Sequence, residues 1–395
     1  EIFEEIQLAI APAPSGTSLK HTELDALVGA PVGSGDGYPG EQPFLAGRLP
    51  RDEWHRDARC DAIEAVVQVH RLREVMAITG FTRIDAPTID PTTGEYDESA
   101  TLAPIAANVT WYPAVESRGE GIFVQLSATA ITAWLDRPAV TARLKALHGA
   151  FERWRADRKA TWDFPGGPYV LLHTLSHLLM QSLAMRCGYP SSSLKERVYV
   201  DAERGRYGFL VYTSTADVDG TLGGLVAQAS DIEAHVLAAL AEGRLCSNDP
   251  TCALHDPSAS LERRFTHGAA CHGCTLVGEV SCETRNEFLD RALVVPVIVA
   301  QLLRRHKLAS GGEAALAALL LALTAFAAHA APASAGERGW DVFGLDIARA
   351  AAPQWPVKPT REPYFPFLPD EPASRSVSIG TPQDGYIVNA VALPL

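Results

Sequence analysis

Cysteines are the residues of this chain whose types and spacing point most directly to chemistry. Five of the seven cysteines are spaced Cys246-x5-Cys252-x18-Cys271-x2-Cys274-x7-Cys282. A C-x-x-C pair directs two thiolates at one ion, and zinc takes four nitrogen or sulfur ligands in a tetrahedron. Thiolates favour zinc or an iron–sulfur cluster over hard cations. We therefore predict a structural zinc site drawn from these five cysteines.

Five cysteines compete for four positions around one ion, so the spacing leaves the ligand set open. It favours Cys271, Cys274 and Cys282, completed by Cys252 or Cys246. Three nearby histidines are possible replacements, His255, His267 and His272. A catalytic zinc is less favoured, because a deaminase carries an H-x-E pattern before its C-x-x-C pair and none precedes Cys271. The alternatives are buried free cysteines or a redox pair.

Two histidines four residues apart, His173 and His177, fall on one face of an expected helix, a spacing that can ligate a metal. A zinc protease would also need Glu after the first histidine, and Thr174 stands there. The sequence therefore favours core or interface histidines satisfied by hydrogen bonds.

The segment around Trp154 is locally basic in an acidic chain. The whole chain has a net charge of −13 and a pI near 5.4, which excludes binding to nucleic acid by bulk charge. Basic side chains interleaved with an aromatic residue can hold a DNA strand. The candidates are Arg143, Lys145, Arg153, Arg155, Arg158 and Lys159. A solvated helix face is the commoner explanation for such a run.

The elements that must position these residues indicate a mixed α/β fold, with a mainly helical C-terminal half and a structural zinc site. Apolar spacing predicts a helix over 63–80, a buried helix over 166–188 and a hairpin around Gly205. The apolar run over 314–328 is too short and too rich in alanine for a membrane span, so we expect a buried helix there. The number of cysteines is odd and most of them are clustered, which favours a location in the reducing cytosol over a disulfide-bonded protein.

Several motifs occur together and in order, and they resemble known families. The stretches "HGAACHGC", "SCETRN" and "FLDR" resemble the cysteine-rich zinc domain of certain DNA repair helicases. With "LLHTLSHLLM", "GFLVYTSTADVDGTLGGL" and "PAVESRGEGIF", the chain resembles the DrmB family of DISARM antiphage defence over about 113–291. The resemblance implies a non-catalytic subunit of a DrmA-like superfamily 2 helicase that engages DNA. No Walker A pattern occurs in the sequence, so we expect no ATPase activity.

The expected organisation has four parts. Residues 1–50 form a loop-rich segment, 51–165 an α/β region, 166–305 a helicase-associated zinc domain, and 306–395 an Ala-rich helix and a Pro-rich segment. Two other functions stay open: a zinc-dependent hydrolase or nuclease, and a free-standing DNA-binding module. A catalytic zinc with a bound water would favour the hydrolase. DNA binding without any partner would favour the module.

Overall fold

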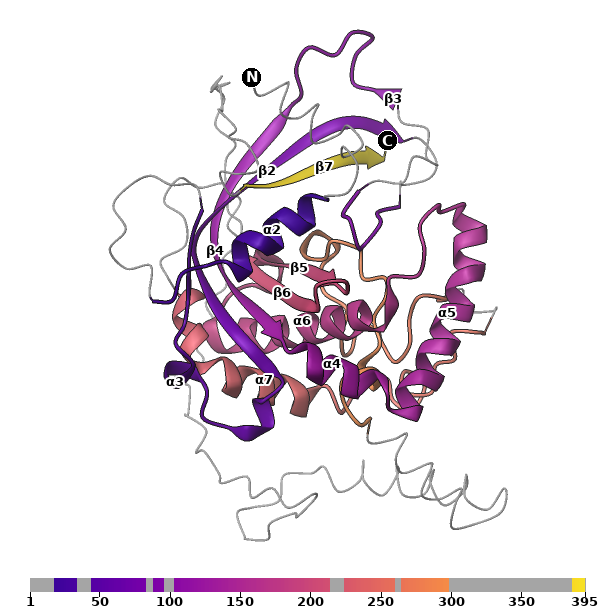
Figure 1. Ribbon diagram of the computed structural model, residues 1–395. Helices are drawn as coiled ribbons and strands as arrows, with labels where there is room; N and C mark the ends of the chain where they lie inside the picture. Colours follow the sequence, from indigo (N-terminus) through magenta and orange to yellow (C-terminus); the bar gives the residue numbers. More distant parts are fainter. Residues whose placement is uncertain are drawn as a thin grey trace, which may run out of the picture. The chain divides into compact units, whose positions relative to one another are not determined.

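The fold is taken from a computed structural model (Figure 1), which describes residues 18–33, 44–82, 88–95, 103–213, 224–259, 264–297 and 386–394. All of these residues belong to one compact unit. The Ala-rich run over 314–328 and the prolines over 353–372 lie outside the described residues.

An antiparallel sheet organises the described residues. Its main path runs β1-β2-β4-β6-β5, and every neighbouring pair on that path is antiparallel. The bounds of these strands are Leu45–Arg48 (β1), Ile63–Thr82 (β2), Ala114–Leu126 (β4), Leu194–Asp201 (β5) and Arg206–Thr213 (β6). Two further strands pair with β2: the short β3 (Ala103–Pro104) and β7 (Tyr386–Pro394), which runs parallel to β2.

The helix predicted over 63–80 is wrong, because this segment forms the long strand β2. Its pairing with β4 shifts register twice, between Ile63 and Ala65 and between Val69 and Leu72. Each irregularity interrupts the period of two, so the apolar spacing imitates that of a helix. The many β-branched residues of the segment, such as Val66, Val67 and Val69, favour a strand once the periodicity is ambiguous.

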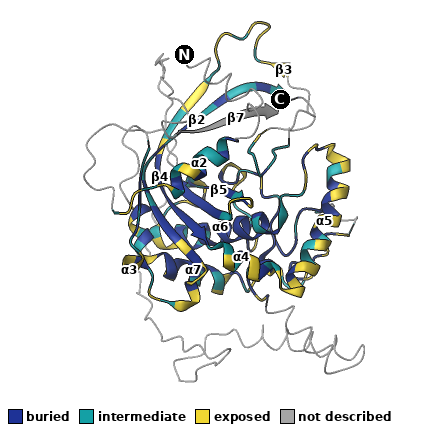
Figure 2. Ribbon diagram, in the orientation of Figure 1, coloured by how far each residue is buried: buried dark blue, intermediate teal, exposed yellow. Residues whose placement is uncertain are grey.

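Helices cover both faces of the sheet. On one face, Ile122, Val124 and Phe209 join a core with residues of four helices, α4 (Ala128–Leu135), α5 (Pro138–Arg158), α6 (Gly166–Cys187) and α7 (Ile232–Glu242). On the other face, Phe123 and Leu210 pack with Leu24 and Leu27 of α2 (Leu19–Val28). Successive side chains along these strands therefore pack into the two cores on opposite faces of the sheet. Figure 2 shows that the centre of the sheet and α6 are largely buried.

Helix α6 and the hairpin confirm their predictions. Helix α6 is buried along most of its length and ends at Gly188, whose φ of 72° is the left-handed conformation that glycine adopts readily. Strands β5 and β6 form the hairpin, and Gly205 lies in its turn with a φ of 64°. The helix expected in the basic segment is α5.

The mixed helix and sheet content of the prediction is confirmed. A mainly helical C-terminal half stays a prediction, because residues 298–385 lie outside the described residues. What is described of the cysteine segment, residues 245–297, consists of turns and two short 3-10 helices, η4 (Glu279–Ser281) and η5 (Arg291–Leu293). The predicted domain boundaries also stay a prediction. None of the described helices is long and apolar enough to cross a membrane.

Candidate metal centre

Four cysteines converge in the cysteine segment. The sulfur atoms of Cys246, Cys252, Cys271 and Cys274 all lie within 4.8 Å of one another. The Sγ–Sγ distances are 3.3 Å from Cys246 to Cys271, 3.6 Å from Cys252 to Cys274, and 3.7 Å from Cys271 to Cys274. Sulfurs at the corners of a zinc tetrahedron lie about 3.8 Å apart, given zinc–sulfur bonds of about 2.3 Å. The four sulfurs therefore fit one zinc ion with no position left for a water.

Tight turns hold these sulfurs in place. Backbone N–H groups of Asn248 and Gly273 each donate to a sulfur at 3.3 Å, and the N–H of Cys271 donates to Cys274 at the same distance. The turn also needs a small residue, because a Cβ on Gly273 would meet Ser247 Oγ at 2.5 Å and Cys246 Sγ at 3.3 Å. Such N–H donors stabilise the negative charge that the thiolates would carry.

Three of the four thiols, those of Cys246, Cys252 and Cys274, have shifted pKa values. Burial raises the pKa of Cys246 to about 12. The hydrogen bond that Cys252 shares with Cys274 raises the pKa of Cys252, and the same bond lowers the pKa of Cys274 to about 5. Neighbouring thiolates repel, so the group ionises completely only when a metal ion compensates the charge.

The fifth predicted ligand, Cys282, does not join these four sulfurs. It is buried in a separate group with His173, His177 and Glu196. None of the three reserve histidines belongs to either group among the described residues. His255 and His267 contact backbone carbonyl oxygens through Nε2, of Arg264 and Asn286 respectively, and His272 is exposed.

The motif "FLDR", residues 288–291, anchors the cysteine segment to the helices. Asp290 is fully buried and accepts hydrogen bonds from the backbone N–H groups of Ala269 and Ala292, at 2.9 and 3.0 Å. Arg143 Nε of α5 donates to the same carboxylate at 2.5 Å. A Cβ on Gly268 would overlap the Asp290 carboxylate, so only glycine fits there without a shift.

The next residue of the motif, Arg291, ties the first cysteine turn to α7. Its fully buried guanidinium donates to the carbonyl of Gly243, at the end of α7, at 3.1 Å. It also pairs with Asp249, which lies between Cys246 and Cys252. Loss of either partner would leave an uncompensated buried charge beside the cysteine turn, so the pair fixes this turn against α7.

The structure divides the predicted DNA-binding residues of α5 into two groups. Arg143 pairs with buried Asp290 at 2.5 Å. Arg155 pairs with Glu152 and with Asp163, both at 2.7 Å. The other predicted residues are exposed, and they are Lys145, Arg153, Arg158 and Lys159. Figure 2 shows that α5 carries both exposed and buried residues.

Trp154 is not available to stack on a base, although its position among basic residues suggested that role. Its ring is buried among Phe151, Trp162 and Phe288. The apolar side of α5 therefore serves the core, and only its charged side faces solvent.

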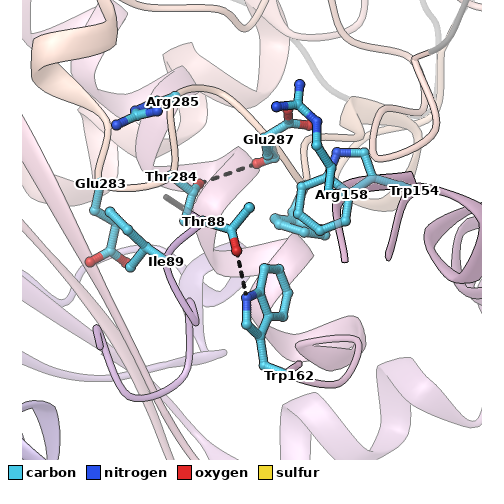
Figure 3. A pocket seen from close by; sticks show the side chains of 10 residues that line it. Thr88, Ile89, Trp154, Arg158, Trp162, Glu283, Thr284, Arg285 and Glu287 are labelled. Atoms are coloured by element: carbon cyan, nitrogen blue, oxygen red, sulfur yellow. Dashed lines mark hydrogen bonds between the residues drawn. The ribbon is translucent and has the colours of Figure 1, made fainter. Parts of the chain in front are cut away.

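A small cavity of about 110 Å³ opens beside the end of α5 (Figure 3). Arg158 and Glu287 line it together with Trp162 and Thr88, which share a hydrogen bond of 3.3 Å. Burial raises the pKa of Glu287 to about 7, although the neighbouring Arg158 charge opposes this shift. Sequence reasoning missed Glu287, because nothing in its spacing distinguishes it from a surface glutamate.

The geometry defines a zinc-binding module, and comparison with known families agrees. Residues 175–275 match the model of the MrfA Zn-binding domain. This range contains the four converging cysteines and ends before Cys282. Zinc is therefore the metal of this domain, as predicted.

A comparison with curated proteins confirms the resemblance to DrmB. The chain is 36% identical over 239 residues to the "DISARM protein DrmB" of Bacillus paralicheniformis. The match covers 59% of this chain and 41% of that relative. The chain thus spans about two-fifths of the length of the relative that it matches.

Proposed function

We propose that this chain acts in bacterial antiphage defence of the DISARM type, as a non-catalytic accessory subunit of a DrmA-like superfamily 2 DNA helicase. The observation that carries this proposal is the 36% identity to the DISARM protein DrmB. The proposed setting is the cytoplasm, where reduced cysteines are available to zinc.

A structural rather than catalytic role for the zinc site supports the non-catalytic part of the proposal. Four sulfurs fill the tetrahedron, so a zinc ion held by them would have no open position for a reactive water. The sequence contains no Walker A loop to cradle the phosphates of ATP. ATP hydrolysis would then belong to the helicase partner. A hydrolase or nuclease would instead require an open metal position and a nearby base.

The proposed contribution to DNA binding rests on the exposed side of α5. Lys145, Arg153, Arg158 and Lys159 would extend a basic groove of the helicase and help to bind or load DNA. The net charge of −13 opposes strong binding by the chain alone. This argues for a shared groove over a free-standing DNA-binding module.

Co-purification from the host tests the proposal. We expect a tagged, full-length chain to retain a superfamily 2 helicase through extensive washing, and mass spectrometry would identify it. The isolated chain should show no ATPase turnover above a matched blank. Purification without a helicase, or turnover that a substitution in this chain abolishes, would overturn the proposal.

A further inference from the structure

A second group of potential metal ligands lies in the interior, apart from the four cysteines. It consists of His173, His177, Glu196 and Cys282, and all four side chains are buried. One ligand atom from each residue lies within 4.8 Å of those of the other three. The group combines two imidazoles, a carboxylate and a thiol, all of which are common zinc ligands.

Three separate elements bring these residues together. His173 and His177 are four residues apart on α6, so they share one face of the helix. Glu196 lies on β5, and Cys282 directly follows η4 of the cysteine segment. The group therefore joins a helix, the sheet and the cysteine segment at one point.

The distances fit a tetrahedral ion. His173 Nε2 lies 3.1 Å from Cys282 Sγ and 3.4 Å from Glu196 Oε1. His177 Nε2 lies 4.0 Å from the same Glu196 oxygen. Ligand atoms on neighbouring corners of a zinc tetrahedron lie about 3.4–3.6 Å apart, given bonds of about 2.0–2.3 Å.

Polar atoms of this group lack partners within the described structure. Nε2 of His177 and Oε2, the second oxygen of the Glu196 carboxylate, are buried and make no hydrogen bond. Nδ1 of His173 is also buried without a partner, but it lies on the other side of the ring from Nε2, so an ion held by Nε2 would not satisfy it. A buried polar atom without a partner destabilises the fold, so the two that belong to ligand groups here call for an explanation. Each of these residues carries a lone pair that a cation can accept.

The surroundings orient the ligands as metal sites do. His177 Nδ1 donates to the carbonyl of Thr275 at 2.8 Å, which leaves its Nε2 lone pair directed at the group. The backbone N–H of Asn286 donates to Cys282 Sγ at 3.1 Å, and that of Glu283 donates to Glu196 Oε1 at 3.0 Å. The Asn286 side chain in turn bonds both backbone groups of Val277, each at 2.9 Å, and fixes this turn.

Charge balance favours a divalent ion over an empty interior site. The carboxylate of Glu196 and the thiolate of Cys282 together carry two negative charges, and the two neutral imidazoles carry none. A divalent cation makes the group neutral overall, which suits full burial.

We propose that His173, His177, Glu196 and Cys282 bind a second zinc ion. This ion is structural, because four protein ligands complete its coordination and burial keeps water away. It joins α6 and β5 to the cysteine segment. The two sites are adjacent in the chain, since Thr275, the partner of His177, follows the ligand Cys274 of the first site.

Metal analysis of the full-length wild-type chain tests this proposal. We expect about two zinc ions per chain, with about five sulfur and three nitrogen or oxygen ligands between them in X-ray absorption spectra. About one zinc ion per folded chain, with sulfur ligands alone, would overturn the proposal. This measurement needs no substitution and does not involve DNA or a helicase.

Single substitutions then assign the second ion. His177→Gln or Glu196→Gln should reduce the zinc content from about two ions to about one and remove the nitrogen and oxygen signal. His267→Gln is the matched control, since this histidine is half-buried in the cysteine segment but lies outside both groups. Two zinc ions retained in a folded His177→Gln and Glu196→Gln double variant would also contradict the site.

Discussion

Arg143 belongs to the basic segment predicted to bind DNA, but its side chain stabilises the fold. Its guanidinium pairs with the fully buried Asp290, whose carboxylate also holds two backbone N–H groups of the cysteine segment. Breaking such a pair leaves a buried charge without compensation, at a cost of about 3–5 kcal/mol.

Charge reversal at two positions of α5 distinguishes a residue that stabilises the fold from one that only faces solvent. Arg143→Glu should lower the free energy of unfolding by about 3–5 kcal/mol, because it places two carboxylates together. Lys145→Glu is the control on the same helix, and its exposed side chain predicts a change within about 0.5 kcal/mol. Urea denaturation of the zinc-loaded chain measures both. Equal stability of the two variants would show that the Asp290 pair does not anchor the segment.

Glu287 predicts a pH dependence of stability. Burial raises its folded pKa to about 7 from the ordinary value of 4.5. An acid with a raised folded pKa favours the folded state at low pH, and that contribution is lost as pH rises from about 4.5 through about 7. Glu287→Gln keeps the shape and removes the charge, so it should raise the melting temperature at pH 8 relative to wild type and change it little at pH 4.5. A parallel shift at both pH values would contradict this assignment.

At the scale of elements, the sequence predicted those whose signals are local. Helix α6 and the β5–β6 hairpin end or turn at glycines with positive φ, which the sequence displays directly. Strand β2 was misread because its register shifts give the apolar residues a helical spacing. Such shifts depend on the partner strand, which one segment does not reveal.

The sequence predicted which metal the candidate site binds, but not which residues lie together at it. The cysteine spacing indicated zinc, but it could not show that Cys282 lies with His173 and His177 of α6. The missing zincin glutamate argued against the histidines, and a carboxylate from β5, Glu196, appears beside them instead. Ligands contributed by distant elements have no spacing rule, so only the fold brings them together.

Removal of one thiolate tests the four-cysteine site. Cys252→Ser should lose the zinc ion of this site and unfold the cysteine segment, because zinc binding supplies folding energy. Cys187→Ser is the control, since Cys187 lies at the end of α6 outside both groups. Elemental analysis and near-ultraviolet circular dichroism report the two effects. A folded Cys252→Ser variant with wild-type zinc content would exclude Cys252 as a ligand.

At the scale of the whole molecule, an acidic chain must bind DNA through a local surface. Reversal of Lys145, Arg153 and Arg158 to Glu should weaken DNA binding by the helicase complex. It should flatten the slope of log affinity against log salt by about 0.7–0.9 for each DNA phosphate that these side chains no longer neutralise. Titrations at several salt concentrations measure both quantities.

A second triple reversal controls for bulk charge. Arg56, Arg59 and Arg204 are exposed on other elements, and reversing them to Glu changes the net charge by the same amount. We expect these changes to leave the salt slope of the complex as it is. An equal weakening of DNA binding in both triple variants would show that the side of α5 is merely solvated.

Reconstitution with a helicase would show whether this chain is a non-catalytic partner of a DNA helicase. The DNA-dependent ATPase activity of a superfamily 2 helicase from the same host would be measured alone, with this chain, and for this chain alone. We expect a stable complex, no turnover by the chain alone, and half-maximal stimulation of the helicase at a lower DNA concentration when the chain is present. Failure to form a complex, or an unchanged DNA dependence in a complex that does form, would contradict this expectation.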